Sequence, residues 1–467
     1  MNKYKKLAFN TLIFTIGSFG SKILSFLLAR LYTSKMLPDE FSTADLIVQT
    51  ANLLIPIATL SITEGIIRFG LDRDFDKKHI YTTGFITTCI GLLILLLLSP
   101  VIHLVPSIGG YTILLLIYMV TSSFRMLNQY FVRSRGLVKL FSADGILTTL
   151  TMLIFNVIFI AVLNMGVLGY ILSIILSDAL SSVFMCLVAD NLKYVQIKGL
   201  DKNVAVSMIR YSIPLIPTYI LWWIVGLSDR YFIVYLIDDY ANGLYSLANK
   251  IPSLINTVST IFFQAWQMSA ISEYKSEGAR TFYTKVFDAY QSMMIVASAG
   301  ILLFLKPIMR IIAADTEYYD GYIYVPVLLI GVLCCCLCQF LSSIYSASKH
   351  TKNSLWTSLV AAIVNIILNV ILIPKMGVQG ACISTLCSYG ICFLIRVNDT
   401  RRYIKFKFNT YKFIINISLL AVMSATIVLD YTHLTIWLLC GFVIIAMNNY
   451  TSIMDTLNQF IKRKKKA

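Results

Sequence analysis

Charged residues are scarce in this chain, since Asp, Glu, Lys and Arg together make up only 13% of its 467 residues. Hydrophobic residues make up 58%, and the mean hydropathy is +0.76. A water-soluble globule cannot bury so much apolar surface. The composition therefore predicts a protein whose solvent is lipid.

The chain also lacks the alternation of apolar and polar residues that a membrane β-barrel requires. Its apolar stretches, such as those around Ile90–Leu98 and Phe413–Leu429, are about 20 residues long, which is the length of a membrane-spanning helix. We expect an all-α polytopic membrane protein with about fourteen transmembrane helices. The predicted helices run over residues 7–32, 41–67, 80–104, 111–132, 141–163, 167–190, 209–235, 243–270, 283–305, 320–346, 353–374, 378–396, 411–429 and 433–450.

Residues that catalyse reactions or bind metals are few and badly spaced. The 4 histidines lie at predicted helix ends or loops, and the 10 cysteines all lie in apolar segments. Even the run Cys334–Cys338 has no histidine or carboxylate nearby at metal-ligand spacing. Because a Gly-rich phosphate loop is also missing, we predict no catalytic residues, no metal site, no cofactor and no enzymatic activity.

The net charge of +16 is typical of nucleic-acid binding, but the basic residues follow another pattern. If the N-terminus is cytoplasmic, most Lys and Arg lie on the cytoplasmic side of the predicted helices. The outer loops hold only Lys35, Lys306, Arg310 and Lys375. By the positive-inside rule both termini are cytoplasmic, the first helix is uncleaved, and no nucleic-acid partner is expected.

Two stretches of the chain repeat each other. Met165–Gly169 (MGVLG) and Met376–Gly380 (MGVQG) differ at one position, and Ser173 and Ser384 follow them at the same distance. Such self-similarity indicates a duplicated unit, as in transporters that work by alternating access. We therefore predict two pseudo-symmetric lobes of about six helices each. The N-lobe covers residues 1–203 and the C-lobe 204–400, while 401–467 form two further helices and a basic cytoplasmic tail.

Basic residues inside the predicted helices are the candidates for substrate binding. A charge at membrane depth costs at least about 2.5–3.5 kcal/mol, so it is retained for a reason. As an alternative, Asp229 or Asp45 neutralises a neighbouring arginine, and a lysine reaches the interface along its alkyl stem. The candidates are Lys22, Arg30, Arg125, Arg230 and Lys250.

Local spacing predicts three structural features. Pro214 and Pro217 at the start of a helix favour a broken segment and a hinge, unless they simply occupy the first helical turn. Asn365 and Asn369 share one helix face, where interhelical hydrogen bonds are expected. Glu64 and Arg68 lie one turn apart, a spacing that allows an intrahelical ion pair.

Several motifs resemble a known family. Arg210–Pro217 (RYSIPLIP), Leu227–Phe232 (LSDRYF) and Ala241–Lys250 (ANGLYSLANK) look like the central signature of the bacterial polysaccharide-transporter family, the Wzx-type O-antigen and capsule repeat-unit flippases. Pro38–Phe41 and Thr63–Phe69 are similar to the N-terminal module of that family.

The resemblance implies a member of the multidrug/oligosaccharidyl-lipid/polysaccharide exporter superfamily with a cationic central cavity. The implied cargo is an undecaprenyl-pyrophosphate-linked oligosaccharide, moved from the cytoplasmic to the outer leaflet of the bacterial inner membrane. Membrane lipid, a polysaccharide polymerase and glycosyltransferases are the implied partners. In-membrane cations fit this cargo, because a pyrophosphate cannot cross hydrocarbon unpaired.

Three other functions are considered. A lipid II flippase shares the fold, the charge and the prenyl carrier. An ion-coupled drug exporter of the same superfamily would be expected to carry carboxylates rather than cations inside its lobes. A membrane polysaccharide polymerase or acyltransferase needs catalytic groups facing its reaction compartment, and the predicted outer loops are too short to supply them.

Overall fold

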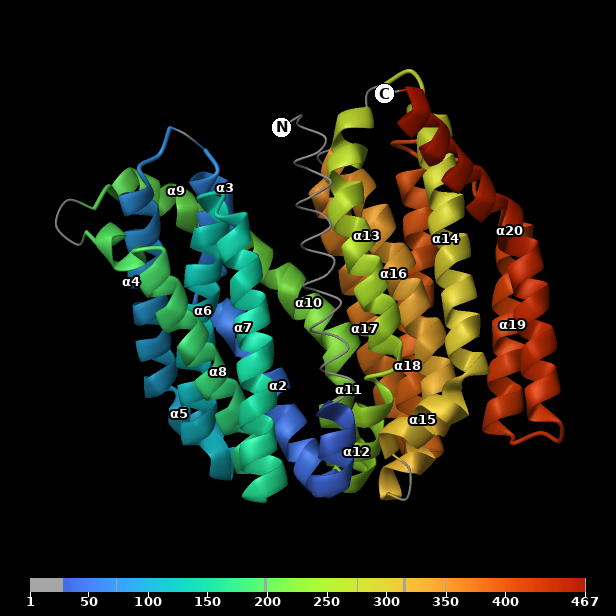
Figure 1. Cartoon of the computed structure of the whole chain (residues 1–467), viewed down its shortest axis with the longest axis horizontal. Helices are drawn as coiled ribbons and strands as arrows, with labels where there is room; N and C mark the ends of the chain where they lie inside the picture. The colour runs from blue at the N-terminus through green and yellow to red at the C-terminus, as the bar shows by residue number, and fades with distance from the viewer. Residues whose placement is uncertain are drawn as a thin grey trace. The chain divides into compact units, whose positions relative to one another are not determined.

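The computed structural model describes residues 28–72, 74–196, 200–274, 276–313, 316–348 and 350–466 (Figure 1). In these residues all regular structure is helical, and twelve helices are long and apolar enough to cross a membrane. Of the other two predicted spans, residues 7–32 lie mostly outside the described residues. Residues 243–270 form α12 and α13, whose apolar part Pro252–Phe263 is shorter. The all-α polytopic class is confirmed.

The chain forms two compact units, which divide between Trp223 and Ile224 inside α10. The predicted lobe boundary at residues 203 and 204 lies at the start of α9 instead. The first unit contains α2 (Pro38–Ala58), α3 (Ile62–Gly70), α4 (Lys77–Leu97), α5 (Ser99–His103), η1 (Gly109–Tyr111), α6 (Thr112–Ser134), α7 (Val138–Asn156), η2 (Val157–Val162), α8 (Gly166–Val188), η3 (Asn191–Tyr194), α9 (Lys202–Ser212), η4 (Ile213–Leu215) and most of α10 (Ile216–Leu227).

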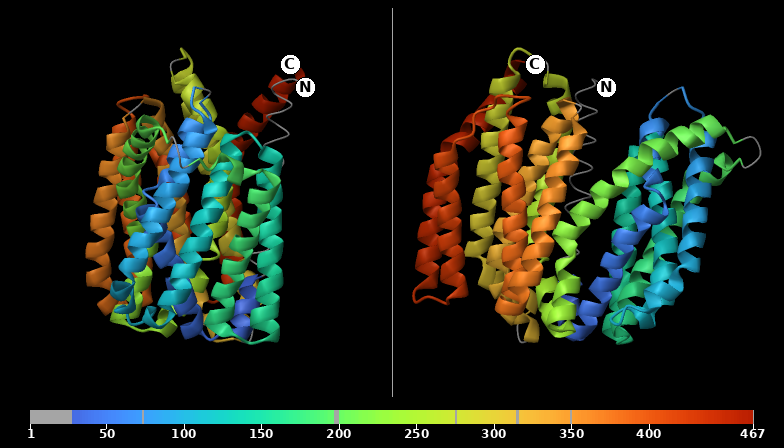
Figure 2. Two further views of the ribbon diagram at one scale, coloured as in Figure 1. Left: turned by 90° about the vertical axis from the view of Figure 1, so that its left-hand side faces the viewer. Right: turned by 180° about the vertical axis from the view of Figure 1, so that it is seen from behind.

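Within the first unit, α8 packs against both α6 and α7, and these three helices carry the charged cluster described below (Figure 2). Within the second unit, α18 packs in the same way against α16 and α17. The second unit contains α11 (Asp229–Leu236), α12 (Asp239–Ala248), α13 (Pro252–Glu273), α14 (Ala279–Leu303), α15 (Leu305–Ala313), η5 (Glu317–Ile323), α16 (Val325–Ser348), α17 (Thr351–Met376), α18 (Val378–Thr400), α19 (Thr410–Val428) and α20 (Leu434–Lys466).

The two stretches predicted to be repeats have the same local structure. Gly166 and Gly377 both have positive φ angles, +51° and +61°, at the entrance to α8 and α18. A residue with a side chain is strained there, which explains why glycine is repeated. About two turns into each helix, Ser173 Oγ donates to the Gly169 carbonyl at 2.7 Å, and Ser384 Oγ donates to the Gly380 carbonyl at 2.8 Å.

The predicted helix over residues 41–67 is wrong in one respect, because a break at Thr59–Ser61 divides it into α2 and α3. Leu60 and Ser61 take left-handed φ angles of +52° and +50°. Pro56, inside α2, has no N–H for the helical ladder, and its carbonyl accepts the N–H of Ser61 at 2.8 Å. The chain therefore leaves the membrane-length helix α2 and starts another helix after three residues.

The helices α19 and α20 are fastened to the rest of the second unit by polar contacts. Lys412 Nζ donates to Ser452 on α20 at 2.6 Å and to Ser292 on α14 at 3.1 Å. At the loop between α19 and α20, Lys306 Nζ lies 2.6 Å from Asp430, and this hydrogen bond raises the pKa of Lys306 above its ordinary value. These contacts hold α19 and α20 against the rest of the second unit.

Candidate functional site

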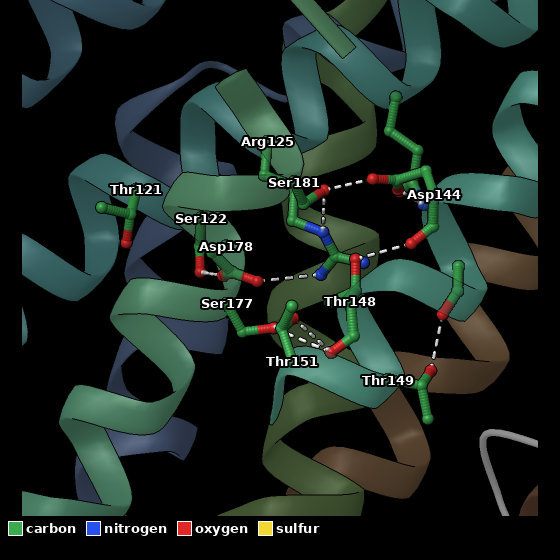
Figure 3. A network of polar contacts seen from close by, with 12 residues as sticks. Thr121, Ser122, Arg125, Asp144, Thr148, Thr149, Thr151, Ser177, Asp178 and Ser181 are labelled. Atoms are coloured by element: carbon green, nitrogen blue, oxygen red, sulfur yellow. Dashed lines mark hydrogen bonds and ion pairs between the residues drawn. The ribbon is translucent and has the colours of Figure 1, made fainter. Parts of the chain in front are cut away.

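A charged cluster lies at membrane depth in the first unit, where α6, α7 and α8 meet (Figure 3). Arg125 Nη1 on α6 contacts Asp178 Oδ1 on α8 at 3.0 Å, and Arg125 Nε lies 3.2 Å from Ser181 Oγ. The Ser181 hydroxyl donates in turn to Asp144 on α7, and Ser122 donates to Asp178. Arg125 is thereby joined to both carboxylates, to one directly and to the other through Ser181.

The cluster contains two carboxylates and one guanidinium, so it carries a net charge of −1 when all three are ionised. Asp144 is 0% exposed and Asp178 is 4% exposed, which makes an uncompensated negative charge costly. Gln129 Nε2 approaches Asp144 at 3.5 Å and supplies only a weak donor. Two buried acids therefore share one cation, and Arg125 is committed to holding both of them.

A second polar cluster lies in the second unit around Asp229, the first residue of α11. Asp229 is 0% exposed and accepts hydrogen bonds from Tyr245 Oη at 2.8 Å and from Asn369 Nδ2 at 2.6 Å. Asn365 Nδ2 donates to it at 3.2 Å, and the Thr385 hydroxyl on α18 donates as well. The predicted interhelical bonding of Asn365 and Asn369 is confirmed, because both join α17 to α11.

The proposed pairing of Asp229 with Arg230 is wrong within the described residues, because the partners of Asp229 are four neutral side chains. The guanidinium of Arg230 lies instead over the ring of Tyr245, 5.8 Å from its centroid. In the part of the chain that the structure describes, Asn369 Oδ1 is buried without a hydrogen-bond partner beside the carboxylate. Carboxylate, amide and hydroxyl oxygens of this kind can hold a proton or a small alkali cation.

The predicted substrate-binding residues are distributed over both units. Lys22 lies outside the described residues. Arg30 is exposed on the helical segment 28–35 of the first unit. Arg230 is 5% exposed on α11, and Lys250 is half-buried at the junction between α12 and α13. The structure brings Arg125 together with Asp178, and a role of these five residues in binding substrate stays a prediction.

The two predicted hinge prolines lie where a helix changes its form. Pro214 lies in the 3₁₀ turn η4 between α9 and α10, and Pro217 is the second residue of α10. The chain stays helical from α9 through η4 to α10 without a loop, so the change of form is limited to this 3₁₀ turn, and Pro217 lies in the first turn of α10. Motion about these prolines stays a prediction.

Sequence reasoning missed three buried charges. Asp144 and Asp178 interrupt apolar helices just as Arg125 does, and the same test of charge at membrane depth would have found them. Arg396 is the last residue of the predicted helix 378–396 and was not among the candidates, yet on α18 it is 0% exposed. Its guanidinium donates to Thr357 and Ser358 on α17 and to Ser342 on α16.

Three solved structures with the same fold are described as a flippase or as transporters. The chain is similar to the lipid II flippase MurJ in an inward closed conformation, with a TM-score of 0.71 and 14% identity over 96% of this chain and 100% of that one. It is similar to an inward-facing multidrug resistance MATE family transporter of the MOP superfamily, with a TM-score of 0.68 and 15% identity over 82% and 94%. For a mutant of the Vibrio cholerae MATE transporter VcmN the TM-score is 0.61, with 14% identity over 85% and 96%. The chain is thus a multi-pass membrane protein with a transporter fold.

Family assignment comes from the sequence. A family model described as "Polysaccharide biosynthesis protein" matches residues 27–316, which is more than half of the chain, and the protein belongs to this family. A model described as "Lipid II flippase MurJ" matches residues 234–448.

Two curated relatives come from the archaeon Methanocaldococcus jannaschii. Uncharacterized membrane protein MJ1375 is 25% identical over 51% of this chain and 60% of its own length. Uncharacterized membrane protein MJ1068 is 24% identical over 69% of this chain and 68% of its own length. The chain therefore matches less than two thirds of the first relative.

Proposed function

We propose that this protein is a flippase for undecaprenyl-pyrophosphate-linked oligosaccharide repeat units, which it moves from the cytoplasmic to the outer leaflet of a bacterial inner membrane by alternating access. The product would enter O-antigen or capsule assembly. The family match over residues 27–316 carries the proposal. The matched range also contains four of the five candidate cations, Arg30, Arg125, Arg230 and Lys250.

The chemistry of the cargo supports this choice. A pyrophosphate that leaves water needs cationic hydrogen-bond donors, and arginine offers two parallel N–H groups to phosphate oxygens. Arg30 is exposed on its helix. We assign it the first contact with the headgroup, together with Lys22, and Arg230 and Lys250 are the candidates for cargo binding in the second unit. Arg125, which is already bonded to Asp178, has the weakest claim to direct contact.

The topology we propose has both termini in the cytoplasm, as the distribution of Lys and Arg indicates. Glycosyltransferases would supply the cargo on the cytoplasmic side, and a polysaccharide polymerase would consume it on the other. The protein itself would form no covalent bond with the cargo.

A lipid II flippase is the second candidate, favoured by the match of residues 234–448 to the MurJ model. Both cargoes share a prenyl pyrophosphate, so the charged residues do not separate them. They differ in the headgroup, which is an oligosaccharide in one case and a peptide-bearing disaccharide in the other. An ion-coupled drug exporter has support only from the shared fold.

The test is transport by the purified protein in proteoliposomes. Vesicles contain a labelled prenyl-pyrophosphate oligosaccharide or labelled lipid II, and an impermeant reagent measures the cargo that reaches the opposite leaflet. We expect rapid movement of the oligosaccharide cargo and slow movement of lipid II. The reverse preference would replace the proposal with the second candidate, and movement of neither cargo would contradict both.

A pair of variants tests the headgroup contact. Arg30→Ala should abolish transport, whereas Lys35→Ala, which removes an exposed basic residue from the same helical segment, should leave it unchanged. Equal amounts of folded protein are confirmed by size-exclusion chromatography. Normal transport by Arg30→Ala would remove this residue from the mechanism.

A further inference from the structure

The break between α2 and α3 opens onto a small cavity within the first unit. The cavity has a volume of about 80 Å³. Its lining supplies one carboxylate and several hydroxyl groups, from the break between α2 and α3 and from α3, α6 and α10. The polar side chains that matter here are Thr59, Ser61, Glu64, Ser123, Tyr130 and Tyr219.

Glu64 brings a negative charge to this cavity. The predicted ion pair with Arg68 is wrong, because the Arg68 side chain is exposed and, among the described residues, the contact of Glu64 is a hydrogen bond from Tyr219 Oη at 2.9 Å. The carboxylate faces hydroxyl groups rather than a cation. A site with one such carboxylate selects against anions.

The hydroxyl groups beside Glu64 are oriented to accept rather than to donate. Thr59 Oγ1 donates its proton to the Ile55 carbonyl at 2.8 Å, and Ser61 Oγ donates to the Pro56 carbonyl at 3.3 Å. Tyr219 has likewise used its proton on Glu64. Because a hydroxyl has one proton and two lone pairs, these oxygens can offer only lone pairs to a ligand.

Ser123 on α6 is the second, independent sign of a ligand. It is 2% exposed, it lines the cavity, and its Oγ has no hydrogen-bond partner within the described residues. A buried hydroxyl without a partner is costly, so native structures seldom keep one unless a ligand or ordered water satisfies it. Tyr130, from the same helix, lines the cavity beside it.

We propose that this cavity is a binding site for a monovalent cation, held by the Glu64 carboxylate, by Ser123 Oγ and by the hydroxyl oxygens of the helix break. Hard oxygen ligands suit alkali cations, and a single carboxylate balances a single positive charge. The volume has room for the ion and about one or two waters, since a water occupies about 30 Å³ in the liquid. A bound ion would tie α2, α3 and α6 together where the backbone leaves the helix.

The experiment measures cation binding without any cargo, so its outcome is independent of the proposed function. The purified full-length protein is kept in detergent with choline chloride at constant ionic strength. Binding of radiolabelled Na⁺ is measured by equilibrium dialysis, and thermal unfolding is followed with added NaCl, KCl or LiCl. We expect saturable binding and an unfolding temperature that rises with at least one of the three cations.

Variants locate the site. Glu64→Gln and Ser123→Ala should each weaken cation binding at least tenfold. Ser298→Ala is the matched control, because Ser298 is a buried serine of the second unit whose hydroxyl donates to the Met294 carbonyl. Asp229→Asn should preserve the binding that depends on Glu64, which separates this cavity from the second oxygen cluster.

Two results would overturn the proposal. The first is an unfolding temperature that none of the three cations changes, which would mean that the cavity holds water only. The second is cation binding that Glu64→Gln and Ser123→Ala leave at its wild-type strength, which would place the ion elsewhere. The stabilising cation need not be Na⁺, because the site is assigned to monovalent cations as a class. If KCl or LiCl alone raises the unfolding temperature, and Glu64→Gln and Ser123→Ala remove that rise, the proposal is supported.

Discussion

Arg125 lies in a membrane span with one buried carboxylate in contact and a second one a single hydroxyl away. Its side chain is 24% exposed, whereas that of Asp178 is 6% exposed. A partly buried pair of this kind contributes little net stability over an apolar pair, but breaking it leaves a charge without compensation. Substituting Arg125 is therefore expected to affect mainly the stability of the folded protein rather than the binding of cargo.

We predict that Arg125→Met destabilises the protein by about 3–5 kcal/mol, because two acids then lack their cation. Adding Asp178→Asn and Asp144→Asn to this variant should recover much of the lost stability, since this cluster then holds no buried charge. Thermal unfolding in detergent measures both steps. Transport by the restored variant then decides the role of Arg125: retained transport indicates a structural residue, and lost transport in a folded protein indicates contact with the cargo.

Among the helices, Arg396 joins three: its own helix α18 and the neighbouring helices α16 and α17. Its guanidinium on α18 donates to side chains of α16 and α17 and to the carbonyls of Cys338 and Ser354. Five donors in a planar fork are matched to acceptors on two neighbouring helices. A lysine has three donors on a point charge and cannot satisfy the same set.

We therefore expect Arg396→Lys to fail as a substitute. Both Arg396→Lys and Arg396→Ala should lower the free energy of unfolding by about 2–4 kcal/mol, because buried acceptors lose their partners in each case. Arg402→Lys is the control, since Arg402 is exposed and pairs with nearby Asp399 at 3.6 Å. An Arg396→Lys protein that unfolds at the wild-type temperature would show that the fork geometry is unimportant.

The packing of α4 against the end of α2 depends on a single glycine. A Cβ atom added at Gly91 would overlap the carbonyl group of Ala58, so α4 can approach the helix break only because Gly91 has no side chain. Backbone atoms cannot move aside as the end of a flexible side chain can. The left-handed turn at Leu60 and Ser61 therefore depends on α4 as well as on Pro56.

Gly91→Ala should cost about 2–4 kcal/mol and disturb the cavity at the helix break, because α4 must move away from Ala58. Gly145→Ala on α7 is the matched control, since a Cβ atom there has no neighbour within 4 Å among the described residues. That change should be neutral or stabilising by up to about 1 kcal/mol, the helix preference of alanine over glycine. Thermal unfolding of both variants tests the pair, and equal values would contradict the close approach of α4.

For the whole molecule, transport of the proposed pyrophosphate-linked cargo would be sensitive to voltage, because that cargo is charged. Moving a negative charge from a negative interior to the outside is downhill by about 2.3 kcal/mol per charge per 100 mV. A diphosphate headgroup with roughly two charges gains about 4–5 kcal/mol at about 100 mV, unless an ion moves with it. The charged step then needs little or no coupling to an ion gradient.

The expected result in proteoliposomes is an initial flipping rate that changes with an imposed potential and responds in the opposite sense when the polarity is reversed. Na⁺ and pH gradients are set to zero in this measurement and restored one at a time as controls. A rate that ignores voltage and requires a Na⁺ or pH gradient would indicate an antiporter. The Asp229 cluster and the cation site proposed at Glu64 would then be the first places to substitute.

The candidate sites could be predicted only in part. The sequence located Arg125 and Arg230 as charges at membrane depth, and it predicted that Asn365 and Asn369 bond across helices. It paired Glu64 with Arg68, one turn away, because that is the only partner local spacing can suggest. In the structure Glu64 contacts Tyr219, which lies on a different helix and far along the chain.

What the sequence by itself determined is the membrane class, the helical content and the duplicated segments, because run length, residue type and glycine placement are local properties. The tertiary structure alone decided which charges are compensated: Arg125 meets Asp178 across α6 and α8, and Asp229 meets neutral donors from three helices. It also decided where a membrane helix breaks, because Leu60 and Ser61 are held in left-handed geometry between Pro56 and α4. In lipid, a buried polar group is stable only with a partner, and the partner comes from whichever helix packs beside it.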